Sequence, residues 1–493
     1  MVETHGHPDH AALAGIIGRM PDVTVAVTGD AMLDRFVYGS VARISPEAPI
    51  PVLQERSETQ MPGGAGNVAR NLAALGVQTR FAAAVGEDDD GRILAELLAA
   101  EPGLLAETLF VAGRVTTRKT RFVAGAQQLL RVDREDVAAL PDPARAALSG
   151  AFSRALADAG AAVLSDYAKG ALDAATAREL IRAANEAGVP VVVDPKHADF
   201  NIYSGAAVIT PNRLELAQGS GMPVGDEEEI VAAARDVLAR TTIGAVLCTR
   251  SADGMILVTP DDVVHVGAEA REVFDVSGAG DTVAAVMAAA MAAGANLIEA
   301  MVLANAGAGI VVGKLGTAVA HPGEILSALQ QRAVIPRAAG KLVPAQEARR
   351  RVAAWQGEGL KVGFTNGCFD LLHPGHVHLL AAARAACDRL VVGLNDDASV
   401  RNLKGDGRPV QTADARALVL GALETVDLVV LFDEPTPQRL IEMLAPDMLF
   451  KGADYRRADV VGGDFVESRG GKVVLIDLSP GYSTTSTIAR MAH

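Results

Sequence analysis

The residues best suited to phosphate chemistry lie at the start of an alanine-rich run. Gly278, Ala279 and Gly280 come directly before Asp281. At a helix start the first backbone N–H groups lack partners within the helix, and the positive end of the helix dipole lies there, so anions bind well. Such a nest of N–H groups suits the charge that builds on a phosphoryl group during its transfer. Considered alone, Asp281 is explained as well by the preference of aspartate for helix N-caps.

An earlier glycine-rich turn, Gly63-Gly64-Ala65-Gly66-Asn67, precedes a second helical run. Because its residues are small, the backbone of this turn can approach a ligand closely. An ordinary turn explains the segment just as well when it is considered alone. The two glycine-rich turns together favour a ligand site.

A pair of histidines follows a strand-like segment in the last third of the chain. His373-Pro374-Gly375-His376 opens a helical run. Residues three apart at a helix start lie on one face, beside free N–H groups. The pair could bind zinc, but no third or fourth ligand is evident nearby, so we assign no metal ligand directly. A buried structural histidine is the other explanation for each residue.

The elements that must position these residues alternate between short apolar runs and helical patterns. This alternation is typical of a mainly parallel sheet covered by helices, so the fold class is α/β. Segments 37–53 and 109–132 are instead β-rich without a long helix, which predicts a small separate sheet, a lid over the first site. The lid is also our candidate surface for a homodimer. The apolar runs that we read as strands of the first domain are Val23–Thr28, Val191–Val193, Ala206–Ile209 and Ala245–Thr249.

A linker is predicted at Ala333–Pro344, because two prolines and a glycine lie there between helical patterns. We therefore assign residues 1–332 to a first domain and residues 345–493 to a second. The second domain has the size of one Rossmann-like unit. Its predicted strands are Lys361–Thr365, Leu390–Leu394, Asp427–Phe432, Met448–Phe450 and Lys472–Ile476.

Composition disfavours several classes of partner. The formal net charge of −15 repels nucleic acid, and the aromatic share of 4% leaves few stacking platforms for single strands. Cys248, Cys368 and Cys387 have no CxxC spacing, as expected of reduced thiols in a cytoplasm. The first residues lack the features of a signal peptide, and the apolar run Val283–Ala293 is too short to span a bilayer. We expect a cytoplasmic protein without nucleic-acid or membrane partners.

The two glycine-rich segments, in this order, resemble the signatures of the ribokinase or PfkB family of sugar kinases. The resemblance covers roughly residues 20–330 and implies a ribokinase-like domain that uses ATP. By this resemblance Asp281 is the base that accepts the proton of the attacking hydroxyl. Gly278, Ala279 and Gly280 correspond to the anion hole for the γ-phosphate.

Further positions acquire roles only from the same resemblance. Asn212 and Glu215 resemble an NxxE motif that organises Mg²⁺ and phosphate, through water. For Glu215 and Thr249, a surface helix or a strand end remains an alternative explanation. The sugar-binding positions are Asp34, Gly64 and Asn67, and those beside the nucleotide are Thr249, Gly254 and Asn305, the last close to the adenine.

The string GCFDLLHPGH resembles the HxGH nucleotidyltransferases of the cytidylyltransferase-like superfamily. In that family the two histidines, here His373 and His376, bind the triphosphate. They stabilise the five-coordinate transition state while a sugar phosphate attacks the α-phosphate. The other positions that match nucleotide- and phosphate-binding segments are Thr365, Asn366, Gly367, Phe369, Asp370, Gly375, Asn395, Asp396, Lys404, Arg408, Arg416 and Lys451.

A terminal Ser483-Thr484-Thr485 resembles the element of that family whose hydroxyls and N–H groups contact phosphates. Related cytidylyltransferases often carry an arginine just before it, whereas this chain reads LSPGYSTT. Without that cation, neutralisation of the phosphate charge falls to Lys404, Arg408 and Mg²⁺.

Almost the whole chain resembles the bifunctional heptose kinase and adenylyltransferase family of lipopolysaccharide synthesis. The strings RISPEAP, LSDYAKGAL, VVVDPK and GKLGT add to the motifs above. The resemblance implies phosphorylation of D-glycero-β-D-manno-heptose 7-phosphate at C1, then adenylyl transfer to heptose 1-phosphate, with ATP and Mg²⁺. It also implies that Asp166 and Lys169 face the sugar and that Lys196 reaches a phosphate. We find no motif for removing the 7-phosphate, so we expect a separate phosphatase to act between the steps.

Two other functions remain open at this stage. A fused kinase and nucleotidyltransferase could act on another sugar or polyol phosphate, because neither motif identifies the substrate. An inactive sensor or scaffold built on kinase folds is the alternative from another class. The intact residues Asp281, His373 and His376 argue against it.

Overall fold

A computed structural model describes residues 8–125, 127–268, 278–314, 316–405, 407–453 and 455–477. The chain divides into two compact units, residues 1–329 and 330–493. Each unit has its own sheet and its own hydrophobic core.

The first unit is built on a nine-stranded sheet of order β13-β12-β11-β10-β9-β8-β1-β4-β5. The strands from β11 to β5 are parallel, and β12 and β13 add an antiparallel edge. Every strand predicted for this unit is present. The bounds are β1 Thr24–Gly29, β4 Gln78–Gly86, β5 Leu104–Val111, β8 Ala161–Ser165, β9 Val191–Asp194, β10 Val208–Ile209, β11 Val246–Thr249, β12 Met255–Val258 and β13 Val263–Val266.

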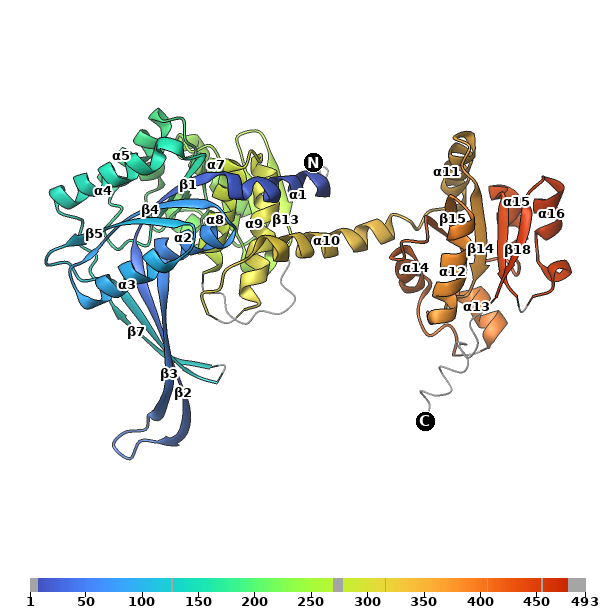
Figure 1. Cartoon of the computed structure of the whole chain (residues 1–493), viewed down its shortest axis with the longest axis horizontal. Helices are drawn as coiled ribbons and strands as arrows, with labels where there is room; N and C mark the ends of the chain where they lie inside the picture. The colour runs from blue at the N-terminus through green and yellow to red at the C-terminus, as the bar shows by residue number, and fades with distance from the viewer. Residues whose placement is uncertain are drawn as a thin grey trace. The chain divides into compact units, whose positions relative to one another are not determined.

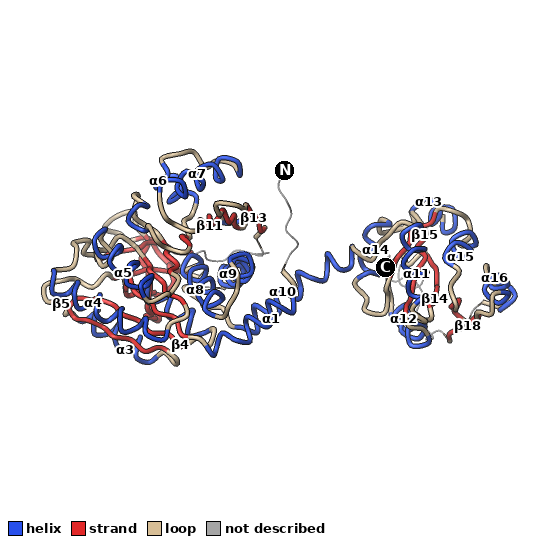
Figure 2. The backbone as a smooth tube through the Cα atoms, turned by 90° about the horizontal axis from the view of Figure 1, so that it is seen from above, coloured by secondary structure: helices blue, strands red, loops and turns tan. Residues whose placement is uncertain are grey.

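Helices cover both faces of this sheet, with one hydrophobic cluster on each side (Figure 2). The apolar run that starts at Val283 belongs to α8, and ten of the fourteen residues of this helix are buried. One face carries α1 His10–Arg19, α2 Ala65–Ala74, α3 Asp89–Ala100, α8 Ala279–Ala292 and α9 Leu297–Val312. The other carries α4 Asp142–Ala155, α5 Ala174–Glu186, α6 Arg213–Ser220 and α7 Glu227–Arg240.

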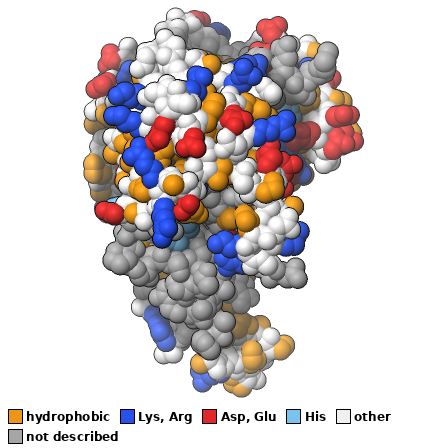
Figure 3. Space-filling model, turned by 90° about the vertical axis from the view of Figure 1, so that its right-hand side faces the viewer, with side chains coloured by type: hydrophobic (Ala, Val, Ile, Leu, Met, Phe, Trp, Pro, Cys, Tyr) orange, Lys and Arg blue, Asp and Glu red, His pale blue; other side chains and the backbone are white. Residues whose placement is uncertain are grey.

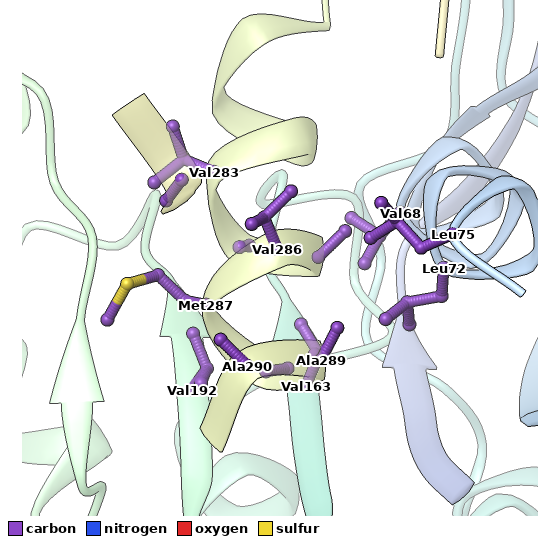
Figure 4. Packing of buried hydrophobic residues seen from close by; sticks show 14 of the residues in the cluster. Val68, Leu72, Leu75, Val163, Val192, Val283, Val286, Met287, Ala289 and Ala290 are labelled. Carbon is purple, nitrogen blue, oxygen red and sulfur yellow. The ribbon is translucent and has the colours of Figure 1, made fainter. Parts of the chain in front are cut away.

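Helix α8 packs in the centre of the first cluster (Figure 4). Its Val286 and Met287 lie among side chains of α2 and of the central strands, including Leu72 and Val163. Most of the remaining α8 side chains are alanine, and small side chains let a helix lie close to its neighbours. This close packing fixes the position of the α8 N-terminus, where Asp281 lies.

A separate four-stranded sheet of order β3-β2-β6-β7 forms the predicted lid. Its strands extend away from the body of the unit (Figure 1). Their bounds are β2 Ala31–Ile44, β3 Pro51–Gly64, β6 Arg118–Ala124 and β7 Gln127–Arg134. One detail of the prediction is wrong: residues 109–111, expected in the lid, belong to β5 at the edge of the main sheet. Strand patterns alone do not reveal which sheet a strand joins.

The second unit contains a five-stranded parallel sheet of order β16-β15-β14-β17-β18, as in a Rossmann-like fold. The order reverses between β14 and β17, where such sheets bind ligands beyond their carboxyl ends. Its strands are β14 Val362–Gly367, β15 Arg389–Asn395, β16 Leu428–Phe432, β17 Met448–Gly452 and β18 Lys472–Ile476. Its helices are α11 Ala345–Gly357, α12 Pro374–Ala386, α13 Asp397–Lys404, α14 Ala413–Gly421, α15 Gln438–Leu444 and α16 Gly463–Ser468.

The expected linker differs from the structure at both of its ends. Helix α10, Pro322–Ala339, continues through Pro336. Beyond it, Leu342 bridges to Val429, and Val343 is buried in the core of the second unit. Proline and glycine are probable rather than certain helix breakers, and tertiary pairing with β16 decides the conformation here.

Acidic and basic side chains are interspersed on the face shown in Figure 3. Within the described part of the chain, no helix combines the length and the apolar character needed to cross a bilayer.

Candidate active sites

In the first unit, Asp281 lies in the first turn of α8 and is only 2% exposed. The N-cap of α8 is Gly278, so the N-cap explanation for Asp281 is wrong. Gly278 has a φ of 83°, and a Cβ there would lie 2.8 Å from Nδ2 of Asn67. The position therefore needs glycine, both for its left-handed backbone and for the close approach of α2.

Both carboxylate oxygens of Asp281 accept hydrogen bonds from other segments. Nδ2 of Asn67, on α2, donates to one oxygen over 2.8 Å. The hydroxyl of Tyr167, which follows β8, donates to the other over 2.7 Å. Burial raises the pKa of Asp281 to about 6, although both hydrogen bonds oppose the shift. The carboxylate is therefore ionised at neutral pH but holds a proton more readily than an exposed aspartate does.

The loop that carries Tyr167 is fastened to Asp30, a buried residue that sequence reasoning missed. The Asp30 carboxylate accepts backbone N–H bonds from Tyr167, Lys169 and Ala171 at 2.8 to 2.9 Å. The available signal was the aspartate in the string TGD, directly after the first predicted strand. Three backbone bonds to one carboxylate leave this loop little freedom.

Asp34 and Gly64, two predicted sugar-binding residues, lie on neighbouring lid strands. Asp34 forms a buried ion pair with Arg121 of β6, with the atoms 2.6 Å apart. It also contributes to the electrostatic environment of Asp281. Gly64 has a φ of 56°, and a Cβ there would meet the Asp30 carbonyl oxygen at 2.5 Å. The structure therefore brings Asp34, Gly64 and Asn67 to the region of Asp281.

Asp166 and Lys169 are partnered within the protein. The Asp166 carboxylate accepts from the hydroxyl of Tyr203 and from the backbone N–H of Ala168, and burial raises its pKa to about 6. Lys169 forms an ion pair with Glu135 over 2.8 Å. In this structure both residues therefore hold the loop after β8 in place.

Asn212 and Glu215 form a capping box at the start of α6, which gives this motif a local structural role. Glu215 also accepts from Lys196 over 2.8 Å. Nearby, burial raises the pKa of Asp194 well above its usual range, and the carboxylates of Asp281 and Glu215 add to the effect. Sequence reasoning missed Asp194, although it precedes Lys196 in the string DPK.

The remaining predicted ATP-binding residues surround the antiparallel edge of the sheet. Thr249 ends β11 and donates its backbone N–H to Pro211. Gly254 has a φ of 83° in the turn before β12. Asn305, buried on α9, donates to the carbonyl of Gly267 over 2.9 Å. Residues 275–277 of the glycine-rich segment lie outside the described residues.

In the second unit, a cleft of about 590 Å³ lies at the carboxyl ends of β14, β15 and β17. It brings together almost all the residues predicted for nucleotide transfer. Those that line it are Thr365, Asn366, Gly367, Phe369, Asp370, His373, Gly375, His376, Asn395, Lys404, Arg408 and Lys451. Asp396 is not among its lining residues; it caps α13 by accepting from the N–H of Ser399 over 2.7 Å.

The two histidine rings stack inside the cleft, with centroids 3.8 Å apart and planes at 21°. His373 is the N-cap residue of α12, and His376 lies in its first turn. Burial, with a smaller contribution from the neighbouring His373, lowers the pKa of His376 to about 4. Within the described residues, Nδ1 of each ring is buried without a hydrogen-bond partner. Neutral imidazoles with unused ring nitrogens can hydrogen-bond to phosphate oxygens.

Cations on the cleft wall are held by groups from neighbouring loops. Arg408 pairs with the buried carboxylate of Asp370 over 2.8 Å. Asp370 also accepts from the backbone N–H of Val410 over 2.7 Å. Lys451 donates to the Asn366 carbonyl over 3.3 Å. Asp370 therefore orients the segment that carries Arg408. Within the described residues, no group of three or more histidine, cysteine or acidic side chains could hold a metal ion.

Comparison with known proteins gives a family for each of the two units. Residues 23–322 match the pfkB family carbohydrate kinase, and residues 364–477 match the cytidylyltransferase-like family. The Bifunctional protein HldE of Rhodospirillum rubrum is 54% identical over 97% of both chains. That of Paramagnetospirillum magneticum is 55% identical over 98% of this chain and 99% of its own. The chain belongs to the HldE family of bifunctional proteins.

Solved structures support the fold of the first unit in this HldE-family chain. Ribokinase of Arabidopsis thaliana, complexed with ribose and ATP, matches with a TM-score of 0.52 and 22% identity, over 62% of this chain and 98% of its own. Phosphofructokinase-2 of Escherichia coli, in complex with potassium, matches with a TM-score of 0.54 and 21% identity, over 63% and 98%. The chain is therefore a kinase and nucleotidyltransferase in which a ribokinase-like unit precedes a smaller Rossmann-like unit.

The sequence motifs did not account for every residue of the HldE-family transferase site. Pro435, Thr436 and Pro437, in the loop after β16, line the cleft but match no motif. Arg416, a motif match without an assigned role, is completely buried. The predicted Ser483-Thr484-Thr485 element lies outside the described residues.

Proposed function

We propose that the chain makes ADP-heptose for the lipopolysaccharide core in two ATP-dependent steps. The first unit phosphorylates D-glycero-β-D-manno-heptose 7-phosphate at C1, and the second transfers an adenylyl group to heptose 1-phosphate and releases pyrophosphate. Membership of the HldE family over nearly the whole chain length supports both steps.

The observation that carries the kinase step is the buried, doubly hydrogen-bonded carboxylate of Asp281 at the start of α8. The C1 hydroxyl attacks the γ-phosphorus of ATP, and Asp281 accepts its proton. The new O–P bond forms as the bond to the β-phosphate oxygen breaks and ADP leaves. The backbone N–H groups around Gly278, Ala279 and Gly280 stabilise the transferred group. Asn67 retains a buried side-chain oxygen with no partner in the described residues, which can accept from a sugar hydroxyl.

An anionic acceptor is supported by Lys119 on lid strand β6. Its Nζ lies 5.1 Å from the centre of the Tyr167 ring, whose hydroxyl donates to Asp281. Burial lowers the pKa of Lys119, while the Asp34 carboxylate opposes the shift. A cation at this place, partly removed from water, favours a sugar that carries a phosphate over an uncharged one.

The kinase site also fits Mg²⁺ held by Asp194 and Glu215. The raised pKa of Asp194, caused by burial and then by Asp281 and Glu215, shows that like charges gather here. A divalent cation would relieve that repulsion. Mg²⁺ is often bound by one or two carboxylates together with substrate phosphates, and it neutralises charge on those phosphates.

In the transferase cleft the 1-phosphate of the sugar attacks the α-phosphorus of ATP. A new P–O–P bond forms, and the bond to the β-phosphate breaks as pyrophosphate leaves. His373 and His376 donate hydrogen bonds to the phosphates, and Lys404, Arg408 and Lys451 balance their charge. The stacked histidine pair, partly buried in the cleft, is the observation that carries this step.

A separate phosphatase must remove the 7-phosphate between the two steps, because both units are already assigned. Purified protein given heptose 7-phosphate, ATP and Mg²⁺ should accumulate the bisphosphate and release little pyrophosphate. Adding a sugar-bisphosphate phosphatase should then produce ADP-heptose. ADP-heptose formed without the phosphatase would contradict this order.

A panel of sugar and polyol phosphates tests whether heptose is the sugar that the chain acts on. A preferred acceptor of another kind would replace heptose in this proposal.

We also propose a homodimer formed through the lid. Its strands expose large apolar side chains, including Ile44 at 61% and Leu130 at 57%. Patches of this kind often mark protein interfaces. Light scattering of the full chain should give a mass of two chains. The double variant Ile44→Asp, Leu130→Asp should give the mass of a single chain. A monomeric parent chain would refute the dimer.

A further inference from the structure

Tyr167 lies in the string LSDYAKGAL without an assigned role, yet it touches the proposed base. It follows β8, and its backbone N–H is held by the Asp30 carboxylate over 2.8 Å. Its hydroxyl donates to Asp281 over 2.7 Å, and Lys119 of the lid lies over its ring. One side chain therefore contacts both the base and the lid.

We propose that Tyr167 is the positioning residue of the kinase base: its hydroxyl orients the Asp281 carboxylate and stabilises its ionised form. This inference rests on the proposed role of Asp281. Asn67 holds the second oxygen from the opposite element, α2. Two donors from separate elements fix the plane of the carboxylate, which a single donor would leave free to rotate.

The phenol is suited to this role because it stays protonated. Burial raises the pKa of Tyr167 well above its ordinary value, and the Asp281 carboxylate raises it further. The hydroxyl therefore remains a donor throughout the pH range of the kinase assay, about 6 to 8.5. Because its backbone is fixed by Asp30, the hydroxyl cannot easily move away when Asp281 takes up a proton.

The other charged groups that act on Asp281 come from neighbouring elements. Asp34 on β2 raises its pKa, and Lys119 on β6 lowers it. The Asp281 carboxylate in turn contributes to the raised pKa of Asp194, at the end of β9. Replacing Tyr167 by phenylalanine leaves these three groups in place, so a change in titration reports the lost hydroxyl.

The test is the pH dependence of kcat/KM for the kinase reaction of the full chain, in which the acid limb reports ionisation of the free base. For Tyr167→Phe we expect this limb to move to higher pH by about one unit, because a hydrogen bond to the ionised form is lost. The variant should lose about fivefold at pH 6 and approach the parent rate near pH 8.5. Titration of the substrate phosphates affects parent and variant alike, so the difference between them remains informative.

Tyr38→Phe is the matched control. Tyr38 lies on lid strand β2 and stacks on Phe36 with centroids 6.1 Å apart, whereas the hydrogen bonds to Asp281 come from Asn67 and Tyr167. It loses the same hydroxyl elsewhere in the unit, so its pH profile should coincide with that of the parent.

An equal loss at every pH, or a profile identical to the parent, would overturn the inference. If Tyr167→Phe does not fold, 3,5-difluorotyrosine at position 167 provides the second variant. Its hydroxyl is a stronger donor and should move the acid limb of kcat/KM to lower pH. An unmoved acid limb would refute the positioning role of Tyr167. Asp281→Asn separates this inference from the function on which it rests. If Asp281→Asn retains kinase activity, the proposed role of Asp281 as the base is refuted. If Asp281→Asn loses kinase activity but the pH profile of Tyr167→Phe does not move, only the role of Tyr167 is refuted.

Discussion

The two active sites are assembled in opposite ways. The kinase site joins side chains far apart in sequence, since Asn67, Tyr167 and Asp281 come from three segments and meet through hydrogen bonds. The transferase cleft uses the ends of adjacent parallel strands and the start of α12, all between Thr365 and Val461. A site of the first kind depends on side-chain networks, and one of the second kind depends on the local fold.

Burial acts on the chemistry of both sites but with opposite sign. It raises the pKa of Asp281 to about 6 and lowers that of His376 to about 4. In each case the protein disfavours the charged form. The consequence is a carboxylate that can accept a proton and an imidazole that stays neutral.

The largest expected effect is that of Asp281→Asn. An amide cannot accept the proton of the attacking hydroxyl, so bisphosphate formation should fall by about 10²- to 10⁴-fold. Adenylylation of heptose 1-phosphate should continue near the parent rate, because the second unit has its own core. Loss of both activities in a folded protein would show that the two sites are not independent.

His376→Ala should affect only the transferase. Loss of a donor to the transition state should cost about 3–4 kcal/mol, or roughly 10²- to 10³-fold in pyrophosphate release. His378→Ala is the matched control, because His378 is exposed on the same helix. If both variants behave alike, His376 has no special role.

Arg416→Gln tests whether the transferase site depends on its local fold. Arg416 donates to the carbonyls of Cys368 and Asn395 and pairs with Asp397. Leaving these buried acceptors unpaired should destabilise the second unit by about 3 kcal/mol, which thermal unfolding would detect. The exposed Arg401→Gln should change stability by less than about 0.5 kcal/mol. Equal unfolding temperatures for the two variants would contradict this role of Arg416.

The boundary between the units gives a smaller effect. We propose that residues 1–332 and the second unit each fold alone. A fragment of residues 340–493 should be more stable than one of residues 345–493 by about 1–3 kcal/mol, since it keeps Val343 and the backbone bonds to Val429. Denaturant titration measures the difference. Equal stabilities would show that these residues contribute nothing to the core.

The smallest expected effect is an absence of titration. With a pKa of about 4, His376 is neutral throughout pH 5–8, so it should add no acid limb to kcat/KM of the transferase. The imidazole resonances of His376, followed by NMR in the free protein, should move only below about pH 5. A midpoint near 6.5 would mean that the ring is solvated.

The sequence alone was sufficient for the features that repeat locally. Strand and helix periodicity predicted the main sheet, the lid and the second unit, because the periodic apolar residues and the turn residues lie close together in sequence. The HxGH string likewise located a cleft whose lining comes mostly from motif segments. The same local reasoning failed at Pro336, where a proline lies inside α10.

Only the tertiary structure showed what surrounds Asp281, the proposed kinase base. Nothing near Asp281 in sequence indicates that Tyr167 and Asn67 donate to it, or that Asp30 fixes the loop of Tyr167. These contacts follow from the order of strands in the sheet, which brings segments more than one hundred residues apart to one edge. The residue types were readable from the sequence, but their hydrogen bonds and shifted pKa values arise from burial, which depends on the packed fold.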